Sequence, residues 1–81
     1  MRSDYPYDEA LNDLFSFFTF HAEEINPHKI LDALEKSRYL KTVPIRVIHQ
    51  KFMDIRKTNS CYFPLTTKEK EMWDDLFRFW G

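Results

Sequence analysis

Apolar residues recur along this chain at the three- and four-residue spacing of amphipathic helices, in four stretches separated by short polar breaks. The first predicted helix follows Pro6 and runs from about Tyr7 to Glu23, with acidic residues at its start that favour the positive end of a helix dipole. One side of it carries the apolar stripe Leu11, Leu14, Phe15, Phe18 and Ala22. Phe17 and Phe20 fall on a different side. Aromatic residues also favour strands, but the spacing and the acidic flanks favour a helix.

The second predicted helix has a clear start signal in the stretch EINPHKILDAL. Asn26 is predicted to be the N-cap, because its side chain can accept a hydrogen bond from a free backbone N–H. Pro27 then takes the first helical position, where its missing N–H costs nothing. Ile25 and Ile30 are spaced to pack against each other across this start. The helix is predicted to end near residues 37–40.

The third predicted helix begins at Thr42 or Val43 and has Pro44 in its first turn. Its apolar face consists of Ile45, Ile48, Phe52 and Ile55. Turn-forming residues follow, and Pro64 disfavours a helix just before it. Residues 61–63 are therefore predicted to be extended or irregular.

The fourth predicted helix begins with a capping box formed by Thr66 and Glu69. Its apolar face consists of Met72, Trp73, Leu76, Phe77 and Trp80, with Phe79 to the side. Short connections make successive helices neighbours. The sequence thus predicts an all-α fold: one compact domain over residues 1–81, with about four short helices in a small bundle or an orthogonal array.

Composition narrows the function classes. Charged residues make up 31% of the 81 residues, and no window approaches the length of an apolar membrane-spanning helix. The N-terminus has no apolar run typical of a signal peptide, and Cys61 is the lone cysteine, so we expect an intracellular, cytoplasmic protein. Gly81 is the single glycine, which excludes glycine-rich phosphate-binding loops.

The residues with metal-binding or catalytic chemistry are widely spaced. His21, His28, His49 and Cys61 show neither a Cys-x-x-Cys pair nor two histidines four residues apart. We therefore predict no metal site, no cofactor and no catalytic residue. An enzyme that uses Cys61 as its nucleophile is the lowest-ranked alternative.

The charge distribution suggests a nucleic-acid alternative. Residues 1–25 hold six acidic residues and one basic residue, whereas residues 36–57 hold seven basic residues and one acidic residue. The second and third helices have the proportions of a helix-turn-helix, whose outward face would present Arg46, His49, Gln50 and Lys57. The turn lacks a glycine, and the acidic first helix would repel phosphate.

The number of large apolar side chains favours a protein–protein interface. A core of this size holds roughly 10–12 large side chains, and the chain offers more. We therefore predict a non-catalytic protein-interaction module, a small modulator such as an adaptor, an inhibitor or a viral accessory protein. It would dock on a larger protein or on its own copy. The predicted anchors are Phe17, Phe20, Trp73, Phe79 and Trp80, with Arg78 at the rim.

Overall fold

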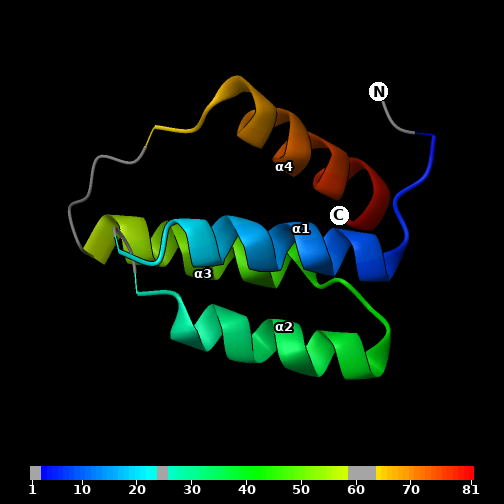
Figure 1. Cartoon of the computed structure of the whole chain (residues 1–81), viewed down its shortest axis with the longest axis horizontal. Coiled ribbons are helices and arrows are strands. Elements are labelled where there is room, and N and C mark those ends of the chain that lie inside the picture. The colour runs from blue at the N-terminus through cyan, green and yellow to red at the C-terminus, as the bar shows by residue number, and fades with distance from the viewer. Residues whose placement is uncertain (1–2, 24–25, 59–63) are drawn as a thin grey trace.

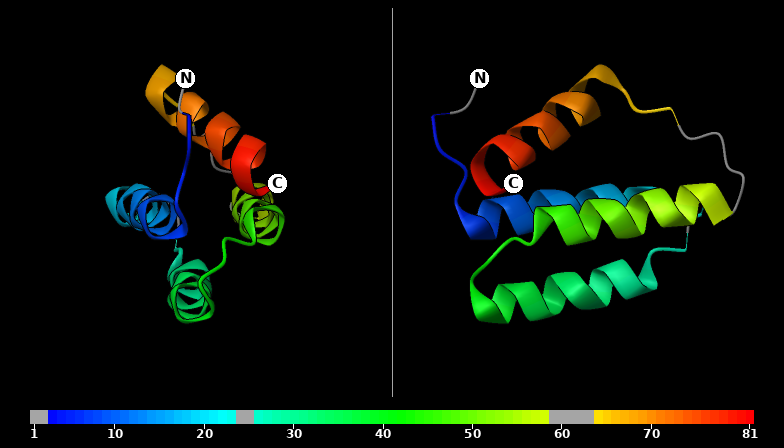
Figure 2. Two further views of the ribbon diagram at one scale, coloured as in Figure 1. Left: turned by 90° about the vertical axis from the view of Figure 1, so that its right-hand side faces the viewer. Right: turned by 180° about the vertical axis from the view of Figure 1, so that it is seen from behind.

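Four α-helices make up the architecture of the computed structural model, which describes residues 3–23, 26–58 and 64–81. They are α1 (Tyr7–Phe20), α2 (His28–Leu40), α3 (Ile45–Thr58) and α4 (Thr67–Trp80). The first three run back and forth beside one another, and α4 lies across α1 and α3 on the side away from α2 (Figures 1 and 2). The described residues contain no strand. The predicted all-α class is therefore confirmed.

The centre of the core is aromatic. Phe52 of α3 stacks on Trp73 of α4, with ring centroids 5.5 Å apart and planes only 2° from parallel. Phe17 of α1 meets both rings edge-on, at 5.5 Å and 5.6 Å. Offset stacking and edge-to-face contacts are the arrangements that aromatic quadrupoles favour. These rings therefore join α4 to the layer formed by α1 and α3.

The contact between α1 and α2 combines apolar packing with polar pairing. Ile30 and Leu34 of α2 are fully buried. Arg38 donates to the side-chain oxygen of Asn12 at 3.1 Å, and its guanidinium lies 5.1 Å from the centre of the Phe15 ring. Such a cation–π contact at a partly exposed site contributes about 0.5–1 kcal/mol.

The stripe predicted for the first helix is shared between its neighbours. Phe15 faces α2, whereas Phe18 lies edge-on to Phe52 of α3 and Trp73 of α4. Ala22, the last residue of the predicted stripe, lies beyond the end of α1 and is exposed.

The capping box predicted for the fourth helix is confirmed. The backbone N–H of Glu69 donates to the Thr66 hydroxyl at 3.2 Å, and the backbone N–H of Thr66 donates to the Glu69 carboxylate at 2.8 Å. The box satisfies two of the backbone donors that a helix start leaves open. Glu69 therefore holds the beginning of α4 in place.

Three predicted helix boundaries differ from the structure. Pro27, rather than Asn26, is the N-cap of α2, and Asn26 instead places its side-chain oxygen 3.1 Å from Nδ1 of His28. The third helix begins after Pro44, whose carbonyl accepts from the N–H of Ile48 at 3.0 Å. The first helix ends at Phe20, and residues 21–23 form turns.

Two sequence predictions fall on residues that the structure does not describe: the packing of Ile25 on Ile30 and the irregular stretch 61–63. Within the described ranges, no helix has the length and apolar character needed to cross a membrane.

Candidate interaction surface

Two of the five predicted anchors belong to the core. Phe17 and Trp73 are each only 5% exposed, because α4 covers the side of α1 on which Phe17 lies. The prediction that both are exposed anchors is therefore corrected. The indole N–H of Trp73 has no hydrogen-bond partner among the described residues, and a buried donor in that state costs about 1–3 kcal/mol.

The remaining anchors lie at opposite ends of the fold. Phe20 is at the C-terminal end of α1, whereas Phe79 and Trp80 are at the C-terminal end of α4 (Figure 1). Phe79 meets Tyr5 edge-on at 6.4 Å, and Nε1 of Trp80 donates to the backbone carbonyl of Tyr5 at 2.7 Å. The N-terminal segment therefore partly covers these two rings. The structure does not bring the predicted residues together in one patch.

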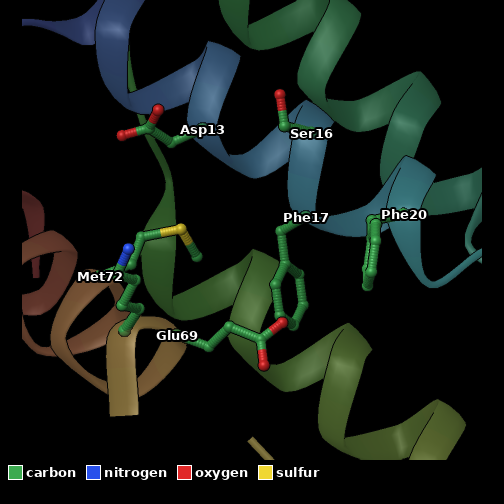
Figure 3. A pocket seen from close by; sticks show the side chains of 7 residues that line it. Asp13, Ser16, Phe17, Phe20, Glu69 and Met72 are labelled. Carbon is green, nitrogen blue, oxygen red and sulfur yellow. The ribbon is translucent and has the colours of Figure 1, made fainter. Parts of the chain in front are cut away.

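Phe20 keeps 79% of its surface exposed at the rim of an open groove between α1 and α4. The groove has a volume of about 360 Å³. Its lining comes from α1 through Asp13, Ser16, Phe17 and Phe20, and from α4 through Lys68, Glu69 and Met72. Figure 3 shows the rings of Phe17 and Phe20 leaving α1 on the same side, with Glu69 and Met72 approaching from α4. The result is an apolar floor between two helices.

A polar contact beside this groove joins the end of α1 to α4. Nε2 of His21 lies 2.6 Å from Oε2 of Glu69, and the His21 ring sits 4.9 Å from the rings of both Phe17 and Phe20. Burial acts to raise the pKa of Glu69, but hydrogen bonds from Thr66 and His21 outweigh it, so this pKa lies below its ordinary value. The contact ties the end of α1 to the start of α4.

A second depression of about 310 Å³ continues the groove towards the N-terminal segment. Both depressions are lined by Asp13, Lys68 and Met72, and the second adds Tyr5, Glu71 and Asp75. The hydroxyl of Tyr5 donates to Asp13 at 2.5 Å. Together the two depressions extend from Phe20 to Asp75, with four carboxylates and one ammonium group along them.

The residues predicted to read nucleic acid divide into two sets. Arg46, Gln50 and Lys57 are exposed on α3. His49 is turned towards α4, where its ring lies 5.5 Å from Trp73 and 5.0 Å from Phe77. Burial, and secondly the charge of Arg56, lower the pKa of His49. His49 therefore packs against α4 and does not extend the outward face.

The basic face of α3 also contains an acidic residue. Asp54 accepts a hydrogen bond from the Gln50 amide at 3.0 Å. The amide of Gln50 is thus already engaged within the helix. Exposed Met53 lies on the same face, and its sulfur is 3.8 Å from a guanidinium nitrogen of Arg56.

Sequence reasoning did not identify several residues of the candidate surface. Ser16 and Met72 line the groove. Away from the groove, at the end of α2, Tyr39 and Leu40 are 88% and 67% exposed. For Ser16, a usable signal is its spacing: it lies four residues before Phe20 and so shares its helix face. No equivalent local pattern marks Tyr39, because its exposure depends on where the helix ends.

Across the residues that the structure describes, no three metal-ligating side chains come together. Cys61 lies outside these residues. The chain matches no protein-family model, no curated protein and no solved structure.

Proposed function

We propose that this protein is a non-catalytic protein-interaction module that docks on a larger protein through the groove between α1 and α4. The observation that carries the proposal is the position of Phe20. A large ring, 79% exposed, stands at the rim of an apolar groove whose floor is formed by Phe17 and Met72. In this reading the protein is a small modulator of its partner.

The energetics favour a partner for this ring. Fully burying a phenylalanine side chain contributes about 1.5–3 kcal/mol relative to leaving it in water. The fold gains little of this from Phe20, which is 79% exposed. Phe and Met are enriched at the centres of protein interfaces. A partner that covers Phe20 and Met72 together would recover the free energy that the isolated fold leaves unused.

The polar groups near the groove already have structural tasks, which supports a binding role over a catalytic one. Glu69 completes the cap of α4 and pairs with His21. Asp13 accepts from Tyr5. A general base must have its lone pairs directed at a substrate, whereas these groups hold neighbouring segments together.

The proposal is tested by affinity capture from a lysate of the source cells with wild type, Phe20→Ala and Met53→Ala. Met53 is the matched control, because it is an exposed apolar residue on another helix, α3. We expect wild type and Met53→Ala to capture the same protein after nuclease treatment, and Phe20→Ala to lose it. Equal capture by all three would contradict the proposal.

The same experiment tests the nucleic-acid alternative. Binding through phosphate contacts weakens steeply with salt, because each contact releases counterions. If capture disappears with nuclease or at moderate salt, and depends on Arg46 and Lys57 rather than on Phe20, the protein binds nucleic acid through the exposed face of α3.

A further inference from the structure

The groove between α1 and α4 is acidic as well as apolar. Helix α1 has no basic residue, and of its three acidic residues Asp13 lines both depressions of the groove. On α4, Glu71 and Asp75 line the extension of the groove, and Lys68 is the one basic residue among the lining groups of its two depressions. A surface with an apolar floor and acidic edges attracts positively charged partners and repels acidic ones.

The two α4 carboxylates that line the extension of the groove, Glu71 and Asp75, contribute little to the stability of that helix. They are four residues apart, so their like charges repel each other on one face of the helix. Lys68 and Arg78, three residues before and after them, offset part of that repulsion. Both lie beyond the first turn, where a negative charge gains little from the helix dipole. Within the described parts of the chain, neither carboxylate takes part in an ion pair or hydrogen bond. Their charges are therefore available to a partner.

The dimensions of the groove suit a helix. The lining residues extend over Asp13–Phe20 on α1 and Lys68–Asp75 on α4. Each of these ranges is about 10 Å long at 1.5 Å per residue. A helix that presents apolar side chains at positions i, i+4 and i+7 covers about the same length. An extended peptide would normally pair with the edge of a sheet, and the described residues contain no strand.

We infer that the groove accepts a basic amphipathic helix of the partner protein. Its apolar side chains would cover Phe20 and Met72, and its lysine or arginine side chains would lie along Asp13, Glu71 and Asp75. This inference rests on the proposed function and adds the chemistry of the partner segment to it.

The test uses two synthetic helical peptides of roughly 14 residues. Both carry leucine at i, i+4 and i+7; one has lysine at the flanking positions, and the other has glutamate there. Binding is measured by fluorescence anisotropy of labelled peptide against the full chain at low ionic strength, where screening is weak. We expect the basic peptide to bind about tenfold or more tightly than the acidic one, and Phe20→Ala to weaken that binding by about tenfold.

A pair of double variants isolates the role of charge. Glu71→Gln with Asp75→Asn neutralises the groove, whereas Glu35→Gln with Asp74→Asn removes the same charge away from its lining. We expect the first pair to reduce the preference for the basic peptide several-fold and the second to leave it unchanged. Far-UV circular dichroism confirms that each variant is folded.

The outcomes separate the inference from the proposed function. If both peptides bind equally, or the acidic one binds better, while a partner captured from lysate still depends on Phe20, the inference is wrong and the proposed function stands. If Phe20→Ala affects neither peptide binding nor capture, both are wrong. If the chain self-associates through Phe20 and the basic peptide does not compete, the occupant is a second copy and the inference is overturned.

Discussion

Aromatic side chains end both α1 and α4, but the N-terminal segment covers only one of the two sets. Trp80 donates to the Tyr5 carbonyl, and Phe79 meets the Tyr5 ring. Phe20, at the opposite end, keeps 79% of its surface in water. The two clusters have similar compositions and different surroundings. What distinguishes them is whether another described segment of the chain contacts them, so the exposed ring of Phe20 is the better candidate for a partner.

The largest expected effect comes from the aromatic residue that α4 covers. Phe17→Ala removes a ring that contacts Phe52 and Trp73 and leaves a cavity between three helices. We expect it to lower the free energy of unfolding by about 3–5 kcal/mol, a large share of the stability of a small domain. Urea denaturation followed by far-UV circular dichroism measures this. A loss below about 1 kcal/mol would show that Phe17 is not in the core.

The next effect concerns the covered end of α4. Trp80→Phe keeps an aromatic ring and removes the hydrogen bond from Nε1 to the carbonyl of Tyr5. We expect a loss of about 1 kcal/mol, together with faster amide hydrogen exchange near the end of α4. Unchanged stability and unchanged exchange would contradict the coupling of the two chain ends.

A smaller effect concerns pH. Burial and the charge of Arg56 lower the pKa of His49 from its ordinary value of 6.5. Below that pH the unfolded state therefore binds a proton more readily than the folded state, and the free energy of unfolding falls as the solution is acidified. We expect His49→Gln to flatten the decline between about pH 7 and pH 5. Identical pH profiles for the variant and wild type would show that His49 is equally basic in both states.

The smallest effect on stability is expected at the exposed end of α1. Phe20→Ala truncates the same residue type as Phe17→Ala, three positions along the same helix. Because Phe20 has few neighbours to lose, we expect the free energy of unfolding to change by no more than about 0.5 kcal/mol. Urea denaturation of the two variants side by side provides the check. A loss comparable to that of Phe17→Ala would place Phe20 in the core and remove the candidate surface.

Local sequence signals predicted much of the fold. The capping box is formed by Thr66 and Glu69, which are three residues apart, so a local sequence pattern is enough to predict it. The apolar spacing of α3 likewise identifies the face that is buried, where Ile48 and Phe52 lie. The start of α2 was less predictable, because the Asn26 side chain has a competing partner in His28.

The candidate site depends on contacts between distant segments, which the sequence pattern does not specify. Phe17 and Phe20 both fall off the main stripe of α1, yet only Phe17 is buried. The difference follows from the position of α4, whose Trp73 reaches Phe17. In the same way, the exposure of Trp80 depends on Tyr5, 75 residues away in the chain. Helical periodicity could place Phe17 and Phe20 off the stripe, but it could not decide which of the two remains exposed.

The most direct test of the central claim is a map of backbone amide chemical shifts when the basic peptide is added to the isotopically labelled full chain. We predict that the shifts concentrate in residues 13–20 of α1 and residues 68–75 of α4, and that Phe20→Ala abolishes them. Shifts that concentrate instead around Arg46, Gln50 and Lys57 of α3, or that persist in Phe20→Ala, would contradict the assignment of the groove as the docking surface.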